Sequence, residues 1–344
     1  MPRIRPARAV RRLLCDGQQP GRGSHVIITV TPNAAVDKTL TVPNFQTGFR
    51  HRASESLTLP GGKGVNIARA LKTLGQPVIV SGLVGGRAGQ QIVEALGREN
   101  ILNDFARIAG ESRTSTAVID STNMSQTEVI EYGPVVSAQE LQAFIEELDL
   151  LAKGAHYMIF AGSLPRRVPD EFYGTVLTRL RKARCVTLVD SAGEPLRLAL
   201  RGHPDFVAPN VHEAEDLVGH EFHDGQDVID ALEIICEMGA QNAIITKSDG
   251  CFARIKHGRH HRVYQATIPL FETIVSSVGS GDSFLAGFVA SHFEKRNVGE
   301  CLRRGLACGA ANTQRFGAGV FDPAEAERLY ESTAVIEVNA AVKD

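Results

Sequence analysis

Short apolar runs rich in β-branched residues recur along the chain from residue 25 onward. They have the length and composition of buried strands, and they lie at 25–30, 77–84, 157–162, 185–190 and 242–247. Between them, apolar positions repeat at helical spacing, at 67–75, 89–100, 137–154 and 170–183. This alternation predicts an α/β fold with a doubly wound, mostly parallel sheet flanked by helices.

Two segments break this alternation. Residues 38–60 and 112–131 show apolar and polar positions that alternate with a period of two and have no helix between them, which is typical of half-exposed strands. Both segments flank helices of the main domain instead of forming a contiguous block. We therefore predict a small β-sheet lid, inserted at one edge of a single domain that spans residues 25–335.

The two ends of the chain differ from this domain. Residues 1–24 contain six arginines and one acid, and we expect them to form a basic, disordered arm. Residues 336–344 are expected to be a C-terminal tail. The whole chain has 37 Lys and Arg against 39 Asp and Glu, so it lacks the basic excess of a general nucleic-acid or membrane-surface binder.

Cysteine usage and hydropathy indicate the compartment. The six cysteines are dispersed and form no CxxC pair, as in proteins of a reducing environment. No apolar run reaches the ~18 residues of a membrane span. We expect a cytoplasmic protein whose partner is a small molecule, with neither nucleic acid nor membrane as a partner.

The strongest local signal for chemistry is the segment Val-Gly-Ser-Gly-Asp-Ser at 278–283, which leads directly into a helical stretch. Backbone N–H groups around Gly279, Ser280 and Gly281, with the positive end of the helix, can form an anion hole for a phosphate. Asp282 can accept a hydroxyl proton at the same place. A plain glycine turn with Asp282 as a helix cap is the alternative, and the segment alone fits both.

A second glycine cluster, Gly-Gly-Lys-Gly-Val-Asn at 61–66, also precedes a helix. It does not satisfy the GxxxxGK[ST] pattern, which argues against a nucleotide P-loop. The composition favours close approach of the backbone to a polyhydroxy ligand, with Lys63 near an anionic group and Asn66 bonded to a hydroxyl. A simple helix-start turn is again the alternative.

Further polar residues follow predicted strands, where an α/β sheet displays ligand groups. Asn33 and Asp37 suit sugar hydroxyls, although they also fit a capped turn. Asn210 and Glu213 could orient hydrated Mg²⁺. A polar, glycine-containing loop at 246–250 follows the last of the strands.

Two other readings of the sequence are weaker. The first is a dinucleotide-binding oxidoreductase, but the glycines at 82, 85, 86 and 89 lack the GxGxxG spacing of that fold. Such a fold would also need a strand that ends near Asp104, and the segment 101–108 is a poor candidate for that strand. Histidines at 257, 260 and 261, and at 220 and 223, could ligate a metal, but solvated loop histidines account for them as well.

In their order along the chain, these segments resemble the PfkB carbohydrate kinase family, in particular its phosphofructokinase and tagatose-6-phosphate kinase branch. The resemblance covers about residues 25–330 and rests on TPNAAVDKTL (31–40), GGKGVNIARAL (61–71), SRTSTAVI (112–119), GSLP (162–165), VDSAGEPL (189–196), PNVHE (209–213), TKSDG (246–250) and VGSGDSF (278–284). The sequence departs from the family pattern at Ala208, where a lysine is common, at Lys247 and Ser248, and at 166–167.

The resemblance implies a ribokinase-like fold that binds a phosphorylated sugar between lid and sheet, with ATP as phosphoryl donor and Mg²⁺. It implies that Asp282 is the catalytic base and that Gly279, Ser280 and Gly281 form the anion hole. The implied sugar contacts are Asn33, Asp37, Gly61, Gly62 and Asn66, and the implied phosphate contacts are Arg113, Lys63 and Arg52. The implied nucleotide contacts are Asn210, Thr246, Lys247, Ser248, Gly250 and Asn312, and Glu213 is implied as the magnesium residue, acting through water.

The activity that the resemblance implies is ATP-dependent phosphorylation of a ketohexose phosphate. The first expectation is 1-phosphofructokinase, which converts fructose 1-phosphate to fructose 1,6-bisphosphate, with 6-phosphofructokinase and tagatose-6-phosphate kinase as alternatives. A sugar-phosphate-binding regulatory protein without turnover is the alternative from another class. Exposed strand edges invite pairing, so we expect a homodimer formed through the lid.

Overall fold

A ten-stranded sheet forms the centre of the computed structural model, which describes residues 26–123, 125–269 and 274–338. Its strand order is β14-β13-β12-β11-β10-β9-β8-β1-β4-β5. The parallel strands are β1 (Ile27–Thr31), β4 (Val78–Gly85), β5 (Leu102–Ile108), β8 (Tyr157–Ala161), β9 (Val186–Asp190), β10 (Phe206–Val207) and β11 (Asn242–Lys247). The antiparallel strands are β12 (Gly250–His257), β13 (His260–Thr267) and β14 (Ala334–Val338).

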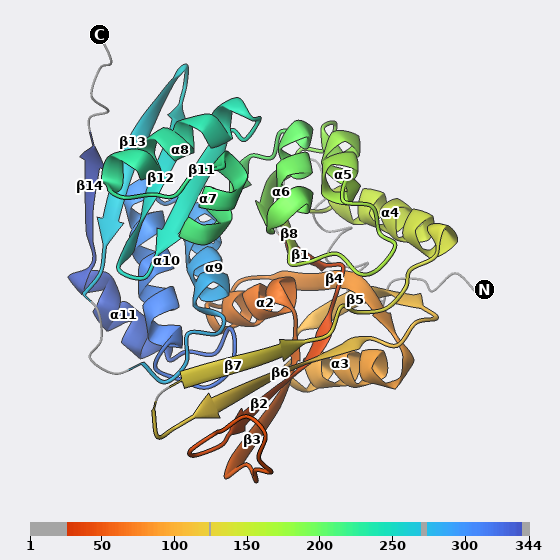
Figure 1. Cartoon of the computed structure of the whole chain (residues 1–344). Helices are drawn as coiled ribbons and strands as arrows, with labels where there is room; N and C mark the ends of the chain where they lie inside the picture. Colours follow the sequence, from red (N-terminus) through yellow and green to blue (C-terminus); the bar gives the residue numbers. More distant parts are fainter. Residues whose placement is uncertain (1–25, 124, 270–273, 339–344) are drawn as a thin grey trace.

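Helices cover both faces of this sheet (Figure 1). One face packs against α2 (Lys63–Thr73), α3 (Gly86–Arg98), α9 (Ser280–Phe293), α10 (Val298–Asn312) and α11 (Pro323–Ser332). The other face packs against α4 (Ala138–Ala152), α5 (Phe172–Leu180), α6 (Gly193–Ala199), α7 (Val211–Val218) and α8 (Gly225–Glu237). Residues of β1 and β8 are buried on both faces, and each large aliphatic side chain there contributes about 1.5–3 kcal/mol through burial.

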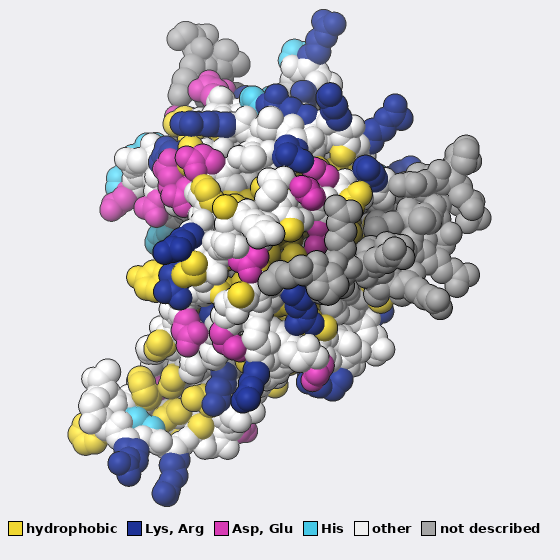
Figure 2. Space-filling view, turned by 90° about the vertical axis from the view of Figure 1, so that its right-hand side faces the viewer, with side chains coloured by type: hydrophobic (Ala, Val, Ile, Leu, Met, Phe, Trp, Pro, Cys, Tyr) yellow, Lys and Arg dark blue, Asp and Glu magenta, His cyan; other side chains and the backbone are white. Residues whose placement is uncertain are grey.

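A second, four-stranded sheet has the order β3-β2-β6-β7 and is called the lid below. It consists of β2 (Ala35–Thr41), β3 (Glu55–Gly61), β6 (Arg113–Asp120) and β7 (Ser125–Ile130). Strands β2 and β6 are parallel, because the chain passes through the main sheet between them. Asp120 fixes the connection from β2 to β3, since its carboxylate accepts hydrogen bonds from the backbone N–H groups of Asn44 and Phe45. The lid projects from the lower end of the molecule and carries a cluster of hydrophobic side chains (Figure 2).

The predicted mostly parallel sheet, its flanking helices and the second small sheet are confirmed. Two local expectations are wrong. Residues 102–108 do form a strand, β5, because they pair with β4 and pack Phe105 into the core. Residues 336–338, expected in the tail, continue β14 and pair with β13.

Some of the chain lies beyond these observations. The basic arm expected at 1–24 and the last residues, 339–344, lie outside the described residues. Over the described ranges, no helix combines the length and the apolar character that crossing a membrane requires.

Candidate active site

The carboxyl ends of the parallel strands face the N-terminal ends of two helices. Helix α2 follows Gly62, whose φ is 97°, and α9 follows Gly279, whose φ is 79°. Both angles lie in the left-handed region that glycine adopts without steric cost, so the chain turns sharply into each helix. Lys63 therefore lies in the first turn of α2, four residues before the helix predicted at 67–75. The two helix starts concentrate positive potential at one place.

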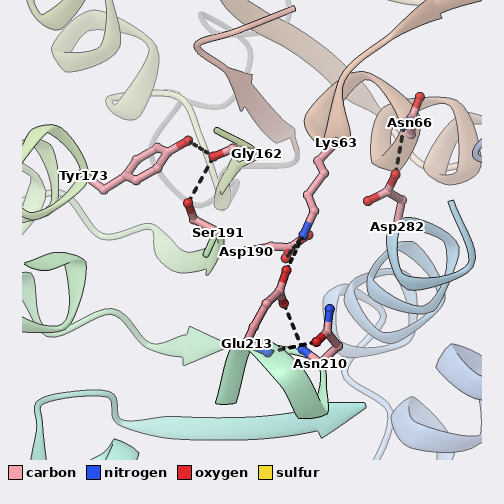
Figure 3. Close-up of polar contacts among 9 residues, drawn as sticks. All are labelled: Lys63, Asn66, Gly162, Tyr173, Asp190, Ser191, Asn210, Glu213 and Asp282. Carbon is pink, nitrogen blue, oxygen red and sulfur yellow. Dashed lines mark hydrogen bonds and ion pairs between the residues drawn. The ribbon is translucent and has the colours of Figure 1, made fainter. Parts of the chain in front are cut away.

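Asp282 lies in the first turn of α9 and is buried, with 6% of its surface exposed. Asn66 Nδ2, from α2, donates a hydrogen bond of 2.8 Å to Asp282 Oδ2 (Figure 3). Burial raises the pKa of Asp282 to about 7, the negative charge of Asp190 adds to this rise, and Lys63 and the Asn66 hydrogen bond oppose it. A carboxylate with a pKa near neutrality suits a general base.

The turn before Asp282 presents backbone donors. The N–H groups of Gly279, Gly281 and Asp282 have no acceptor within the ranges that the structure describes, whereas the N–H of Ser280 donates to the Ser277 carbonyl. The free N–H groups and the start of the fourteen-residue helix α9 form a group of donors to which an anion can bind.

Lys63 is held between two carboxylates. Its Nζ lies 2.8 Å from Asp190 Oδ1 and 3.4 Å from Glu213 Oε1 (Figure 3). Burial acts to lower the pKa of Lys63, but the charges of Asp190 and Glu213 outweigh it and raise that pKa. Lys63 is therefore paired with protein carboxylates in this structure.

Asp190 is a residue that sequence reasoning misses. It ends β9, so it occupies the same kind of strand-end position as the residues predicted after the first strand. The sequence does contain an indication of its position, because the apolar run 185–190 that predicts a strand ends in this acid.

Asn210 and Glu213 form a capping box at the start of α7. Asn210 Oδ1 accepts from the Glu213 N–H at 3.0 Å, and Glu213 Oε2 accepts from the Asn210 N–H at 2.9 Å. This exchange satisfies helix-terminal donors and holds the Glu213 carboxylate with Oε1 toward Lys63. The predicted loop 246–250 lies alongside, because the Thr246 N–H donates to the Pro209 carbonyl.

The other members of this loop have separate surroundings. Lys247 is exposed and pairs with Asp249 at 3.4 Å, and Ser248 is exposed. Gly250 lies in β12 against β13, where a Cβ would lie 2.1 Å from the Ala266 carbonyl oxygen.

The turn after β8 is fixed by two hydroxyl groups. Tyr173 and Ser191 both donate to the Gly162 carbonyl, at 2.7 and 3.1 Å (Figure 3). A Cβ at residue 162 would lie 3.7 Å from Lys63 Cβ. The fixed turn therefore lies against the start of α2.

The base of the lid brings the remaining predicted sugar residues together. Arg113 Nε donates to the Asn33 carbonyl at 3.1 Å. Burial raises the pKa of Asp37, while a hydrogen bond from the Gly62 N–H and the charge of Arg113 act against this rise. Gly61 lies directly under Asp37, because a Cβ there would be 1.8 Å from Asp37 Oδ2.

Asn33 has a buried acceptor without a partner at this place. It is buried, and its Nδ2 donates to the Tyr132 carbonyl and to Ser163 Oγ. Its Oδ1 has no hydrogen-bond partner among the described residues. A buried acceptor without a partner is costly. Gly133 packs close to this oxygen, because a Cβ there would lie 2.1 Å from it.

Two predicted residues lie apart from this group. Arg52 is exposed and lies three residues before β3, whereas Gly61 ends that strand. The strand alone spans roughly 20 Å from its first residue to Gly61. Asn312 is fully buried, and its amide accepts from Ser283 Oγ and donates to the Val278 carbonyl. Asn312 therefore stabilises the turn before α9 from the buried side of that turn.

A cavity of about 50 Å³ lies between the lid and α2. Its walls include Asp37 of β2, Leu57 of β3, Asn66 of α2 and Val278 before α9. Two of the predicted sugar contacts therefore share one cavity.

The histidines do not form a metal site in the described part of the chain. His257 bonds to the Tyr264 hydroxyl at 3.0 Å, and His261 bonds to the Gln241 carbonyl at 3.1 Å. Within the described ranges, no group of three or more His, Cys, Asp or Glu side chains is placed to hold a metal ion.

Comparison with known proteins identifies related sequences and folds. Residues 31–325 match the model of the pfkB family of carbohydrate kinases. Phosphofructokinase-2 from Escherichia coli, in complex with fructose-6-phosphate, is 24% identical, with 89% of this chain and 98% of that chain covered and a TM-score of 0.79. A "Possible 1-phosphofructokinase" from Thermotoga maritima is 24% identical, with 92% and 100% covered and a TM-score of 0.81. Ribokinase from Arabidopsis thaliana, in complex with ribose and ATP, is 22% identical, with 89% and 98% covered and a TM-score of 0.69.

Proposed function

The chain belongs to the pfkB family of carbohydrate kinases, and from this premise we propose that its acceptor is a phosphorylated ketohexose, fructose 1-phosphate, which it converts to fructose 1,6-bisphosphate. The protein is an ATP-dependent sugar kinase with a ribokinase-like fold. We propose both the identity of the acceptor and the residues that catalyse the phosphoryl transfer.

The observation that carries the proposal is the position of Asp282 beside free backbone donors. Its buried carboxylate takes the proton of the acceptor hydroxyl, and that oxygen attacks the γ-phosphorus of ATP. The bond from the γ-phosphorus to the β–γ bridging oxygen breaks, and ADP leaves. The free N–H groups of Gly279, Gly281 and Asp282 bind the oxygens on which negative charge develops. Because base and donors belong to one turn, proton removal and charge stabilisation occur at one point.

Asp190 and Glu213 fit a magnesium ion. Hard carboxylate oxygens are the ligands that Mg²⁺ prefers, and Mg²⁺ keeps several of its waters. Both carboxylates already face a cation, Lys63 Nζ. We assign them to hold Mg²⁺ directly or through water, with Asn210 fixing Glu213. When bound, the ion neutralises phosphate charge.

Other predicted nucleotide contacts are assigned by position. The loop 246–250 lies beside Asn210, because the Thr246 N–H donates to the Pro209 carbonyl, and we propose that this loop borders the nucleotide. Asn312 is assigned a positioning role instead of direct contact, because its side chain is fully buried behind the turn before α9.

Arg113 supports a phosphorylated acceptor. Its Nε and Nη1 donate to the carbonyls of Asn33 and Glu131, and its Nη2 group has no acceptor in the described part of the chain. A guanidinium with a free edge can bind a phosphate at a fixed angle. Asn33 and Asp37 would then hold sugar hydroxyls. We leave Arg52 out of this site because of its distance from Gly61.

We also propose that the protein pairs through the lid. Large apolar side chains are exposed on or beside the lid, namely Phe49, Val129, Ile130 and Tyr132. Val129 and Ile130 belong to β7, an edge strand of the lid, and an edge strand has unpaired backbone groups that can pair with a second copy. Sedimentation of the wild-type protein and of an Ile130→Glu variant tests this, and a monomeric wild type at micromolar concentration contradicts it.

The experiment that tests the acceptor measures ADP release with a panel of sugars. The panel is fructose 1-phosphate, fructose 6-phosphate, tagatose 6-phosphate, fructose and ribose. We expect the highest kcat/KM with fructose 1-phosphate. The second candidate, 6-phosphofructokinase, is favoured by the fructose-6-phosphate complex of the E. coli relative and predicts the highest value with fructose 6-phosphate. Turnover of only the unphosphorylated sugars contradicts the role of Arg113.

A further inference from the structure

We propose that Arg69 is a positioning residue for phosphoryl transfer, which orients the Asn66 amide so that its NH₂ end, and not its oxygen, faces Asp282. The functional part of this inference rests on the proposed role of Asp282 as base. The hydrogen-bond arrangement itself rests only on the geometry around the guanidinium.

Arg69 lies on α2 and is buried, with 8% of its surface exposed. Nε and Nη2 bind the two carboxylate oxygens of Glu99, at 2.7 and 3.2 Å. Nη2 also donates to the Pro60 carbonyl at 2.5 Å. Nη1 donates to the Ala318 carbonyl at 2.9 Å and to Asn66 Oδ1 at 3.3 Å. All five N–H donors of the guanidinium are thus engaged by protein groups, so Arg69 is not a ligand for substrate phosphate.

The contact with Asn66 decides which end of its amide meets the base. The two ends of an asparagine amide have nearly the same shape, and their hydrogen-bond partners fix the orientation. Because Asn66 Oδ1 accepts from Arg69, Asn66 Nδ2 points at Asp282 Oδ2, 2.8 Å away. The reversed amide would place two acceptor oxygens against each other.

The other contacts tie this arrangement to its surroundings. Pro60 lies near the end of lid strand β3, immediately before the glycine pair. Ala318 lies against the turn before α9, since a Cβ at Gly279 would be 2.5 Å from Ala318 Cα. One guanidinium therefore links the base of the lid, the partner of Asp282 and the anion-binding turn.

Asp282 is also surrounded by charged groups with which Arg69 forms no hydrogen bond or ion pair in the described part of the chain. These are Lys63 of α2, Asp190 of β9 and Asp37 of β2. The charge of Arg69 also lowers the pKa of Asp37, which gives Arg69 a second, electrostatic route to Asp282. The Asn66→Ala background separates this route from the one that passes through Asn66.

A double-mutant cycle tests the functional part. The variants are Arg69→Gln, Asn66→Ala and the double variant, with kcat measured on the best acceptor of the sugar panel. We expect Arg69→Gln to lower kcat by roughly tenfold in the wild-type background and by less than about twofold in the Asn66→Ala background, because contacting residues are non-additive. Equal losses in both backgrounds would overturn the proposal.

Glu99→Gln is the matched control. It weakens the ion pair of Arg69 on the side away from Asn66 and leaves the donor to Asn66 in place. We expect it to lower the melting temperature while kcat stays within about twofold. A loss of kcat equal to that of Arg69→Gln would show that Arg69 acts through general stability and would overturn the positioning role.

A spectroscopic measurement keeps the inference separate from the proposed function. The side-chain NH₂ signals of Asn66 are assigned in ¹⁵N-labelled protein by their absence in Asn66→Ala. We expect these signals to shift in Arg69→Gln, or in Arg69→Lys if the glutamine variant does not fold, since one point charge cannot replace the planar fork. Unchanged signals overturn the inference. If the wild type phosphorylates no sugar, the proposed function fails, and the NMR result still decides the arrangement.

Discussion

Replacing Gly61 by alanine tests whether the Asp37 carboxylate is placed for an acceptor hydroxyl. A Cβ at residue 61 would lie 1.8 Å from Asp37 Oδ2 and 2.0 Å from Cγ. Since non-bonded atoms settle at about 3.5 Å, the carboxylate has to move by roughly 1.5 Å. The hydrogen bond from the Gly62 N–H to Asp37 is then lost as well. A misplacement of about 1 Å in a positioning group costs on the order of 10²-fold in rate.

We therefore expect Gly61→Ala to lower kcat/KM for the sugar phosphate by about 10²-fold, with little change in KM for ATP. Steady-state kinetics with each substrate varied in turn measures both effects. Gly97→Ala in α3 is the matched control, because a Cβ there meets nothing within 4 Å. We expect it to raise the free energy of unfolding by up to about 1 kcal/mol without changing the kinetics. Wild-type kcat/KM in Gly61→Ala would refute the role given to Asp37.

Three further predictions follow from the charged groups. Arg113→Ala should raise KM for the sugar phosphate by at least about tenfold, with a smaller effect on kcat, and Arg113→Lys should restore part of the loss; an unchanged KM contradicts the phosphate assignment. The kcat/KM profile should fall below pH about 7, because Asp282 must be ionised to act as base, and a profile that is flat down to pH 5 contradicts this. Burial, with the charge of Asp104, raises the pKa of Glu147 from 4.5 to about 8, so the folded state keeps a proton that the unfolded chain releases, and stability falls as pH rises through this window. Urea unfolding should show that Glu147→Gln stabilises more at pH 9 than at pH 5; an equal effect at both pH values contradicts the shift.

Residues that belong to one continuous motif could be predicted well. Asn66 and Asp282 each lie in a glycine-led helix start, and both starts face the carboxyl ends of parallel strands, where such folds bind ligands. The structure brings the two side chains within 2.8 Å of each other. For Lys63 the motif predicted an anionic neighbour, but the neighbours in the structure are protein carboxylates, which lie more than 120 residues away in sequence.

Residues that depend on tertiary neighbours could not be predicted. Asp190 ends a strand that the sequence predicts, but the sequence around it does not indicate that β9 lies two strands from β1 in the sheet. The role of Arg69 depends on Glu99 and Ala318, which come from distant parts of the chain. Strand β5 contains Asp104 among its polar residues, and its pairing with β4 overrides a weak local preference.

The same holds for the C-terminal strand. Ile336 in β14 is 57% exposed, so the segment lacks the pattern of a buried strand. Its position is fixed by pairing with β13 across five residues, which is information that the local sequence does not contain.

The most direct test of the account is the turnover of Asp282→Asn. ADP release from ATP with fructose 1-phosphate is measured for this variant and for the wild type, and calorimetry measures ATP binding by both. We expect a folded variant that binds ATP as the wild type does and loses about 10²–10⁴-fold or more in kcat, the contribution of a positioned general base. A variant with near wild-type kcat would contradict the assignment of Asp282 as the base.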